Sequence, residues 1–570
     1  MMRQIDNPIM TLFLAVTLFA IGSRAQEGRS QGRSVVVSRY GIVAAESPLA
    51  AQAGATILAR GGHAVDAAVA ANAVMGLVAP HMNGMGGDLF AIVYEARSGK
   101  LYGLNASGWA PAGMTIEFLK QKGITEMPPA GIHTVTVPGA ADGWDKLLSR
   151  FGRMKFAEVL APAIHYAEEG FPVTEWSAAA WLGSEQAIRN DPNASRTFLP
   201  NGRPPQFGEI FKNPDLAWSL KQIAAGGRPA FYEGEIARRI VKTSEQHGGA
   251  MALADLAEFS SEWVDPISTT YRGWTVYEIP PSGQGIAALS MLNIVENFPL
   301  GKFGHNSVDA LHVMIEAKKL AYADVLRYVA DPRFSKVPVA GILSKEYAKK
   351  RSQLIQMAKA NCDVPSGQPP VPSGGDTTYL SVVDREGNMV SFIQSNFAGF
   401  GSGLVAEGTG FALQNRGNLF SLDPSHPNAL AGRKRPLHTI IPGMMSKGDV
   451  RIAFGIMGGW NQSQAHAQFV SNLVDHGMNI QAALEAARFT KRTFEGCDVQ
   501  MEARIAREVR DELSRRGHQI SQLGIYSDIV GGGQAVMRDF STKVNYGASD
   551  PRKDGAAIPE PPPEQKQSTR

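Results

Sequence analysis

The chain has 570 residues, of which 44% are hydrophobic and 19% are charged. This composition is typical of a globular protein with enough apolar material for a large core. Lysine and arginine number 56 and aspartate and glutamate 53, a formal net charge of +3, so no strong field favours nucleic acid or an anionic membrane as a partner.

Residues 1–25 are typical of a secretory signal peptide. Arg3 begins a weakly basic segment, and the apolar stretch Ile9–Ile21 is too short to span a bilayer comfortably. Ser23 and Ala25 supply small residues at the two positions that signal peptidase favours, so cleavage before Gln26 is expected. We therefore expect export to the periplasm or the extracellular space, and an uncleaved membrane anchor is the alternative. No later stretch is apolar for long enough to span a membrane.

The chain after this signal begins with strand and helix patterns in turn. Residues 33–46 are typical of a strand, and Ser47 can cap a helix over 47–62 that two glycines end. A second helix, over 63–80, is apolar on nearly all sides and is therefore expected to be buried. A glycine turn and a pair of strands follow over 83–108.

The middle of the chain is mainly helical, and strands return near its end. Apolar residues recur every three to four positions through 110–360, where one strand intervenes at 273–280. The tail over 556–570 is rich in proline and charge and is expected to be disordered. Because strands gather at both ends, we predict an α/β fold with one core assembled from both ends of the chain. Further strands are expected at 378–384, 388–395, 449–458 and 531–539, and helices at about 462–488 and 501–516.

The segment Cys362–Asp376 contains proline, glycine and serine and almost no apolar residue, which is typical of a domain linker. Cys362 and Cys497 are the only two cysteines. Export would permit a disulfide, but two cysteines make no disulfide framework, and we expect two unpaired or buried thiols. Two cysteines also cannot supply a zinc site of four thiolates.

Some patterns point to other chemistry but lack the context that it needs. Glycines at 283–288 match a dinucleotide-binding turn, but two prolines interrupt the approach, so we expect only a glycine turn that could still shape a site. His312 and Glu316 lie four residues apart without the His-Glu-x-x-His pattern of zinc proteases, so an ion pair or a core histidine is expected. No phosphate-binding loop or G-x-S-x-G turn occurs. We expect neither a metal nor an organic cofactor.

Thr377 directly follows the glycine-rich segment and opens a strand. It is either an ordinary strand residue or the first residue of a new chain cut after Asp376. In the second case its hydroxyl is a nucleophile, and its α-amine, with a pKa of ~7.7–8.0, can take the hydroxyl proton. The oxyanion that forms needs N–H donors, and the bare backbone of Gly458 and Gly459 is a candidate. The same hydroxyl could attack the Asp376 carbonyl, and water would open the resulting ester.

Eight motifs occur in one order along the chain. They read "GGHAVDAAVAANAVMGLVAPHMNGMGGDLFAIVYE", "VPGAADGW", "YADVLRYVADPRF", "DTTYLSVVDREGNMVSF", "GFGSGLVAEGTGFALQNR", "KRPLHTIIPGMM", "GGWNQSQ" and "DPRKDGAA". Together they resemble the γ-glutamyltransferase family of N-terminal-nucleophile hydrolases over most of the chain. The resemblance implies a four-layer αββα sandwich and a proenzyme that cuts itself into a large subunit, 26–376, and a small subunit, 377–570, which stay partners.

The resemblance also assigns roles to several residues. Thr377 matches the nucleophile, and Ser395 matches a threonine that hydrogen-bonds the nucleophile and aids the cut. Gly458–Gly459 match the oxyanion loop, and His438–Thr439 replaces a serine pair that contacts the substrate carboxylate. An ordinary strand serine and a purely structural glycine turn are the alternatives.

The glutamyl-binding pattern of the family is incomplete here. Ser107 stands where the family has the arginine that pairs with the α-carboxylate, and Phe397, beside Asn396, stands at a family asparagine. Ser107 and Asn396 are therefore expected to be substrate-binding residues. Arg416 and Leu419 replace the glutamine and aspartate that hold the α-amino group. Serine cannot replace a bidentate arginine contact, and a buried arginine repels an ammonium group. We hypothesise that Arg416 binds an anionic group of the substrate, and a scaffold arginine is the alternative.

The resemblance implies a self-processing threonine amidase that hydrolyses or transfers the γ-glutamyl group of glutathione and related amides through an acyl-enzyme on Thr377. Water or an amine or peptide would accept the acyl group. The altered pocket favours, as an alternative, an amidohydrolase of another acid amide, of the oxamate or the glutaryl/cephalosporin type. An unprocessed, non-catalytic binding protein is the alternative from another class.

Overall fold

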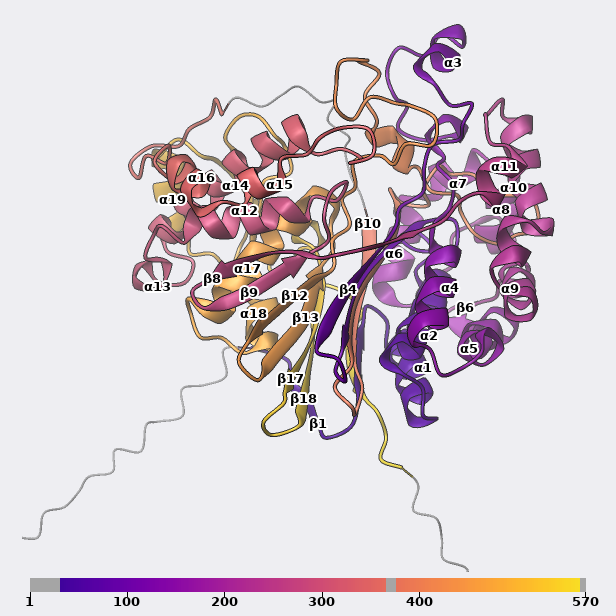
Figure 1. The fold of residues 1–570 in the computed structure, drawn as a ribbon, viewed down its shortest axis with the longest axis horizontal. Helices are drawn as coiled ribbons and strands as arrows, with labels where there is room; N and C mark the ends of the chain where they lie inside the picture. Colours follow the sequence, from indigo (N-terminus) through magenta and orange to yellow (C-terminus); the bar gives the residue numbers. More distant parts are fainter. Residues whose placement is uncertain (1–30, 365–375, 564–570) are drawn as a thin grey trace, which may run out of the picture.

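The computed structural model describes residues 31–364 and 376–563, and two seven-stranded sheets lie at its centre (Figure 1). The predicted signal peptide, and most of the segment expected to be a linker, lie outside the described residues. Neighbouring strands in both sheets are antiparallel. Across the first sheet the order is β1 (Val36–Ser38), β18 (Val544–Ser549), β17 (Gly533–Asp539), β13 (Val450–Ile456), β12 (Gly443–Lys447), β9 (Trp274–Glu278) and β8 (Ile267–Tyr271). Across the second it is β19 (Ala556–Pro559), β2 (Ile42–Ala45), β10 (Asp376–Val383), β11 (Met389–Phe397), β3 (Asp88–Glu95), β4 (Lys100–Ala106) and β7 (Glu262–Val264).

Both sheets take strands from both ends of the chain. In the second sheet, β10 and β11 lie between β2 and β3, which come from the first hundred residues. In the first sheet, β1 at the start of the described chain pairs with β18 near its end. The prediction of an α/β fold with a core assembled from both ends is therefore confirmed.

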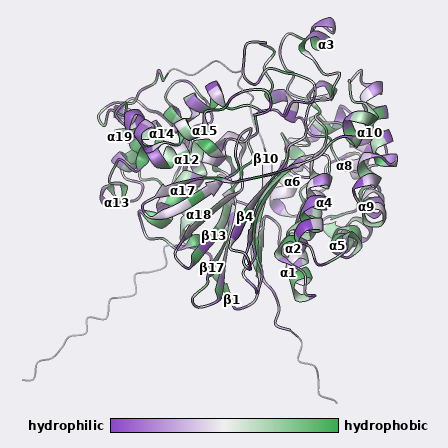
Figure 2. Ribbon diagram, in the orientation of Figure 1, coloured by the Kyte–Doolittle hydropathy of each residue, from purple (hydrophilic) through white to green (hydrophobic). Residues whose placement is uncertain are grey.

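The two faces of each sheet pack against different layers of the protein. Along β3, Phe90 and Ile92 belong to an apolar cluster shared with Met444 of the first sheet, whereas Leu89 and Ala91 pack with helices. This alternation follows from the two-residue period of a strand. Helix α2 (Ala64–Val78) contacts β10 and β11 of the second sheet, and α17 (Gln462–Val474) contacts β13 of the first. Figure 1 shows helices on both sides of the strands, and Figure 2 shows hydrophobic residues in the strands and in adjacent helices such as α1 (Pro48–Ala59).

The first two helices begin in different ways. Pro48 occupies the first turn of α1, where its missing N–H costs nothing, but Ser47 forms no side-chain capping bond, contrary to our expectation. At the start of α2, the His63 ring accepts a hydrogen bond from Val65 while Asp66 accepts one from the His63 backbone. Nearly every residue of α2 is buried, as its apolar pattern predicts.

The middle of the chain is mainly helical, as predicted. Its helices are α3 (Ile116–Gln121), α4 (Ala140–Phe151), α5 (Phe156–Glu169), α6 (Glu175–Gly183), α7 (Glu185–Arg189), α8 (Pro192–Phe198), α9 (Pro214–Tyr232), α10 (Glu235–Gln246), α11 (Leu253–Ala257), α12 (Gly285–Val295), α13 (Leu300–Phe303), α14 (Val308–Tyr328), α15 (Val339–Ile342) and α16 (Lys345–Ser352). The strand expected at 273–280 is β9, but the expectation of a single strand in this part is wrong. β7 and β8 also lie here, and two short strands, β5 (Phe171–Pro172) and β6 (Ile210–Phe211), pair with each other. Within 31–364 and 376–563, no helix has the length and hydrophobicity that crossing a membrane requires.

The C-terminal part corrects several expectations. The helix expected over 501–516 is shorter, because β15 (Asp498–Glu502) precedes α19 (Arg507–Arg515) and pairs with β14 (Phe489–Thr490) and β16 (Gln519–Leu523). The helical stretch over 462–488 is divided into α17 and α18 (Ile480–Glu485). Four residues of the tail expected to be disordered form β19, because they pair with β2 at the sheet edge.

The expectation of two unpaired thiols is wrong. Cys362 and Cys497 form a disulfide, with their Cα atoms 4.9 Å apart. They are separated by 135 residues in the sequence. Only the packing of β15 beside the segment that follows α16 brings them together, and that packing leaves no signal in the local sequence.

Candidate active site

Thr377 lies near the start of β10, and its side chain is buried. Its hydroxyl donates a hydrogen bond to Oγ of Ser395 on β11, at 3.3 Å. The amide Nε2 of Gln462, the first residue of α17, donates to the Thr377 hydroxyl at 3.4 Å. Two strands and a helix from different parts of the chain therefore converge on one hydroxyl oxygen.

A β-bulge lies opposite this threonine. The pairing of β10 with β11 shifts register between Asp376 and Thr378. As a result, Ser395 and Asn396 together face the single residue Thr377. The residue that follows the bulge has a positive φ of 80°. Bulges re-aim side chains and are frequent beside active sites, and this one turns the Ser395 hydroxyl toward Thr377.

Arg416 connects Ser395, the hydrogen-bond partner of Thr377, to Thr439. It begins the short helix η3 (Arg416–Leu419) and is fully buried. Its Nη2 donates to Oγ of Ser395 at 3.0 Å, and its Nη1 donates to Oγ1 of Thr439 at 2.5 Å. The guanidinium plane lies over the Phe397 ring, 4.4 Å from its centroid. Side-chain hydroxyls and an aromatic face thus hold a cation beside the proposed nucleophile.

The charge of Arg416 is only partly compensated. Its hydrogen-bond partners are neutral hydroxyls, and within the described part of the chain its Nε has no partner. Burial lowers the pKa of Arg416 to about 9, while the Asp88 carboxylate acts in the opposite direction. A buried cation without a hydrogen-bonded carboxylate is the arrangement that an anionic ligand would complete.

Asp88 is the first residue of β3, and its carboxylate binds three other segments near the site. One carboxylate oxygen accepts hydrogen bonds from the Gly108 backbone and the Gln414 amide, both at 2.7 Å. The other lies 2.9 Å from Nε2 of His438. This carboxylate therefore joins the second sheet to the loops that carry Arg416 and Thr439.

His438 is neutral at pH 7. Burial is the main cause that lowers its pKa to about 4, Arg416 adds to the decrease, and Asp88 opposes it. The Ile440 backbone N–H donates to Nδ1 of His438, so the ring proton is on Nε2 and is donated to Asp88. The histidine thus positions the adjacent Thr439 without adding a second positive charge.

The glycine loop that the sequence predicts as an oxyanion site lies directly before α17. Gly458 and Gly459 have positive φ values of 122° and 58°, which favour glycine, and they lead through η4 (Gly459–Asn461) into α17. Neither N–H donates a hydrogen bond to any other residue in the described ranges. Three residues further on, Gln462 reaches the Thr377 hydroxyl, so the free donors lie in the loop that delivers this contact.

The turn that matched a dinucleotide-binding pattern supports this site instead. Nε2 of Gln284 donates to the carbonyl oxygens of Thr439 and Gly459, at 2.6 Å and 2.8 Å. Its Oε1 accepts a hydrogen bond from the Tyr322 hydroxyl at 2.7 Å. The segment at 283–288 therefore joins the backbone at Thr439 to the glycine loop.

Two residues predicted to bind substrate have structural partners. The Asn396 amide donates to the backbone of Asn83 at 3.1 Å and of Pro80 at 3.4 Å. Ser107 is buried at the end of β4, where its carbonyl accepts a hydrogen bond from Arg435. Between residues with described positions, neither side chain hydrogen-bonds Thr377 or Arg416, so their role in substrate binding stays a prediction.

Sequence reasoning overlooked three residues that complete the site: Asp88, Gln284 and Gln462. Asp88 and Gln462 are part of the motifs "GMGGDLF" and "GGWNQSQ", but nothing in those motifs says which side chain turns inward. Gln284 lay in a pattern that suggested a different ligand. Their roles follow from contacts between segments that are far apart in the chain.

One group of described residues has ligand atoms close enough for a metal ion. His312, Glu316 and His518 are buried, and their candidate ligand atoms lie within 4.8 Å of one another. The Lys319 ammonium lies 2.5 Å from a Glu316 oxygen, so a cation already neutralises that carboxylate. Of the two expectations for this pattern, the core histidine fits, because His312 is buried and hydrogen-bonds His518 and the Gln356 carbonyl. Glu316 forms its ion pair with Lys319 and not with His312.

Comparisons with known proteins agree with the geometry. The family model described as gamma-glutamyltranspeptidase matches residues 50–560. The chain is 38% identical over 532 residues to the glutathione hydrolase-like YwrD proenzyme of Bacillus subtilis, covering 92% of this chain and 99% of that one. It is 34% identical over 532 residues to the oxamate amidohydrolase proenzyme of Klebsiella pneumoniae, covering 91% and 98%. The solved structure of cephalosporin acylase from Bacillus halodurans has a TM-score of 0.86 and 44% identity, covering 95% of this chain and 99% of that chain.

The resemblance seen in the sequence motifs is therefore confirmed across nearly the whole chain. The similar proteins are named as hydrolases and acylases, and several are made as proenzymes. This chain is an enzyme that belongs to the gamma-glutamyltranspeptidase family.

Proposed function

We propose that this protein is a self-processing amidase whose nucleophile is the hydroxyl of Thr377. The observation that carries the proposal is the chain of contacts from Thr377 through Ser395 and Arg416 to Thr439, next to a glycine loop with free N–H groups. We infer that the two sheets and their helices form the four-layer αββα sandwich of N-terminal-nucleophile hydrolases. We also propose export, with residues 1–25 removed.

Self-cleavage comes first in this scheme. The Thr377 hydroxyl attacks the carbonyl of Asp376, the peptide C–N bond breaks, and the Thr377 nitrogen leaves as a free amine. Water then hydrolyses the ester, which restores the hydroxyl and ends the large subunit at Asp376. Ser395, which accepts the threonine proton in a hydrogen bond, helps to orient the hydroxyl for this attack.

The mature threonine then acts on an amide substrate. Its α-amine takes the hydroxyl proton as the oxygen attacks the carbonyl, and the N–H groups of Gly458 and Gly459 stabilise the oxyanion. The C–N bond breaks, the amine product leaves with that proton, and an acyl ester remains on Thr377. Water or a second amine attacks the ester and releases the acyl group. These residues supply the nucleophile, the base and the oxyanion donors of the reaction.

Arg416 supports an acyl donor that carries a carboxylate. γ-Glutamyl amides such as glutathione meet this requirement and are the first candidate, in line with the glutathione hydrolase names among the relatives. Oxamate or glutaryl amides, which lack an α-ammonium group, are the second candidate. The second is favoured by one feature: the positions expected to hold an ammonium carry the cationic Arg416 and the apolar, buried Leu419.

The first test replaces the nucleophile. Thr377→Ala is expected to migrate on a reducing, denaturing gel as one uncut band without amidase activity, because no other hydroxyl replaces its Oγ1. Thr378→Val is the matched control, because in the described structure the buried Thr378 hydroxyl has no hydrogen-bond partner. Wild-type protein that migrates on the same reducing gel as a single uncut band, unchanged by Thr377→Ala, would show an unprocessed binding protein and falsify the proposal. Mass spectrometry would locate the cut.

The second test separates the two substrate candidates. Hydrogen bonds to a charged group contribute about 1.5–3 kcal/mol, so Arg416→Gln is expected to lower kcat/KM for carboxylate-bearing donors by about 10- to 100-fold. Glutathione and γ-glutamyl-p-nitroanilide are compared with oxamate and a glutaryl amide, with exposed Arg507→Gln as the control. Rapid γ-glutamyl turnover that survives Arg416→Gln would exclude Arg416 as the carboxylate-binding residue.

A further inference from the structure

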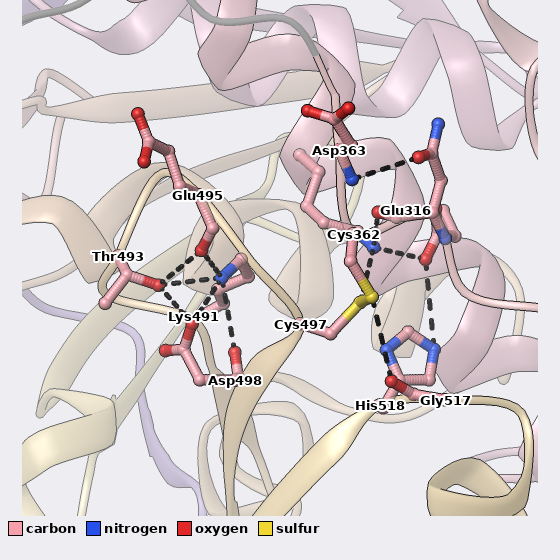
Figure 3. The surroundings of a disulfide bond; sticks show 12 residues. Glu316, Cys362, Asp363, Lys491, Thr493, Glu495, Cys497, Asp498, Gly517 and His518 are labelled. Carbon is pink, nitrogen blue, oxygen red and sulfur yellow. Dashed lines mark hydrogen bonds and ion pairs between the residues drawn. A yellow bond between two sulfur atoms is a disulfide. The ribbon is translucent and has the colours of Figure 1, made fainter.

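The disulfide between Cys362 and Cys497 joins two residues that lie on opposite sides of the proposed cut in the sequence. Cys362 precedes Asp376 and so belongs to the large subunit, whereas Cys497 belongs to the small subunit. Their Cα atoms are 4.9 Å apart, which is within the usual range for a disulfide. Figure 3 shows the bond between the segment that carries Asp363 and the strand that carries Asp498.

We infer that this disulfide covalently joins the large and small subunits of the mature enzyme. The inference rests on the proposed cleavage between Asp376 and Thr377. Before the cut, the disulfide closes a loop within one chain. After the cut, it is the single covalent bond between two chains, because the sequence has no other cysteine.

The surroundings hold Cys362 in place independently of the chain between it and Thr377. The backbone N–H of Ala360 donates to the Arg516 carbonyl at 2.7 Å, and Cys362 Sγ lies 3.8 Å from the Gly517 carbonyl oxygen. Both acceptors belong to the small subunit. From the large subunit, Lys319 of α14 donates to the Asn361 carbonyl at 2.5 Å. Residues 360–362 of the large subunit are therefore already fixed against the small subunit when the cut is made.

The same lysine lies beside the buried sulfur. Nζ of Lys319 is 3.9 Å from Sγ of Cys497, which is 1% exposed, while Cys362 is exposed. An external thiolate can therefore reach Sγ of Cys362, form a new S–S bond there and break the old one. The electron pair goes to Sγ of Cys497, which lies near the Lys319 ammonium that also pairs with Glu316.

Formation of the bond needs an oxidant. The two thiols lose two protons and two electrons, which a thiol–disulfide oxidoreductase in its disulfide form accepts by exchange. Such oxidants act in the periplasm and in other oxidising compartments. The link would therefore form where the proposed signal peptide sends the protein.

The test is a denaturing gel of the purified protein expressed from the full-length sequence. Free thiols are first blocked by iodoacetamide. Without reductant we expect one band at the mass of both subunits together, and with dithiothreitol two bands. Two bands without reductant would overturn the covalent link while leaving self-cleavage intact. One band under both conditions would overturn the proposed cleavage, and with it the inference. The two failures are therefore distinguishable.

Three variants sharpen the result. Cys362→Ser and Cys497→Ser are each expected to give two bands with and without reductant, because either change removes the same bond. Thr377→Ala is expected to give one band in both lanes, which shows that reductant separates only a chain that has been cut. A cysteine variant that keeps a single band without reductant and two with it would contradict the assignment of the link to this pair.

The difference in exposure can be tested on the same variants. Cys362 alone, in Cys497→Ser, is expected to react with the disulfide reagent DTNB at least about tenfold faster than Cys497 alone, in Cys362→Ser, because a buried sulfur is hard to reach. The opposite order would overturn the assignment of Cys362 as the sulfur that external thiols attack.

Discussion

Burial decides which side chains near Thr377 carry a charge. The pKa of His438 is lowered to about 4, so this ring is a neutral donor to Asp88, whereas Arg416, at about 9, remains a cation at pH 7. The Arg416 cation is therefore held by neutral hydroxyls close to the Thr377 hydroxyl. This electrostatic pattern suits a substrate whose acyl group is anionic.

A buried histidine should make the protein sensitive to acid. Both ring nitrogens of His81 lack a hydrogen-bond partner within the described residues, and burial lowers its pKa to about 3. Between the unfolded pKa of ~6.5 and this value, only the unfolded chain binds the proton, so stability falls as the pH falls. His81→Leu is expected to reduce the stability difference between pH 7 and pH 5 by about 2 kcal/mol.

Urea midpoints of wild type and His81→Leu at the two pH values check this prediction. The variant replaces a ring without hydrogen bonds by an apolar side chain, so it removes the titrating group without orphaning a partner. Exposed His165→Leu controls for the loss of a histidine from the surface. An unchanged difference between pH 7 and pH 5 in His81→Leu would show that His81 is not the acid-sensitive group.

At the scale of elements, a turn and a bulge together place Thr377. The turn before β3 brings Gly87 against β11, where an added Cβ would overlap the Ser395 carbonyl oxygen and lie 2.6 Å from Oδ1 of Asn396. The carbonyl of Gly87 also accepts hydrogen bonds from the first residues of α4 and the loop before it. The bare glycine allows β3, β11 and α4 to meet at the bulge opposite Thr377.

Gly87→Ala is therefore expected to push β3 away from the bulge and to slow self-cleavage. The overlap with backbone is expected to cost about 1–3 kcal/mol of stability. Gly183→Ala is the matched control, because an added Cβ there meets nothing within 4 Å and the residue lies in α6. The measurements are the thermal midpoint and the fraction of cut chain on a reducing, denaturing gel. Normal cleavage in Gly87→Ala would show that the close approach does not set the geometry at Thr377.

For the whole molecule, the disulfide closes a large loop before the cut. Its ends are separated by 135 residues, and a loop of that size is expected to stabilise the uncut chain by roughly 3–5 kcal/mol through the entropy of the unfolded state. This loop includes Thr377, so the precursor is held together while its active site forms. After cleavage the same bond limits separation of the subunits instead.

This stabilisation can be measured in the uncut background of Thr377→Ala. Adding Cys497→Ser is expected to lower the urea midpoint of unfolding, and adding Cys362→Ser should lower it equally, because each removes the same bond. If the two double variants differ markedly, one of the cysteines contributes by packing as well. Equal midpoints in all three proteins would show that the disulfide adds no stability to the precursor.

Local patterns in the sequence were sufficient to predict the α/β class, the family and the position of Thr377 at the start of a strand. These features depend on two-residue and three-to-four-residue periods and on motifs of adjacent residues, which a linear chain displays directly. The α2 helix illustrates this: its unbroken apolar run predicts burial, and nearly all of its residues are buried.

Contacts between segments that are remote in the sequence could be identified only from the tertiary structure. The pairing of Cys362 with Cys497, the strand at 556–559, and the convergence of Asp88, Gln284 and Gln462 each join segments that are remote in sequence. Their formation depends on how sheets and loops pack, and no local period encodes that packing. The residue types around Thr377 are therefore written in the sequence, whereas the neutral environment of Arg416 and the covalent link between the two halves arise from tertiary packing.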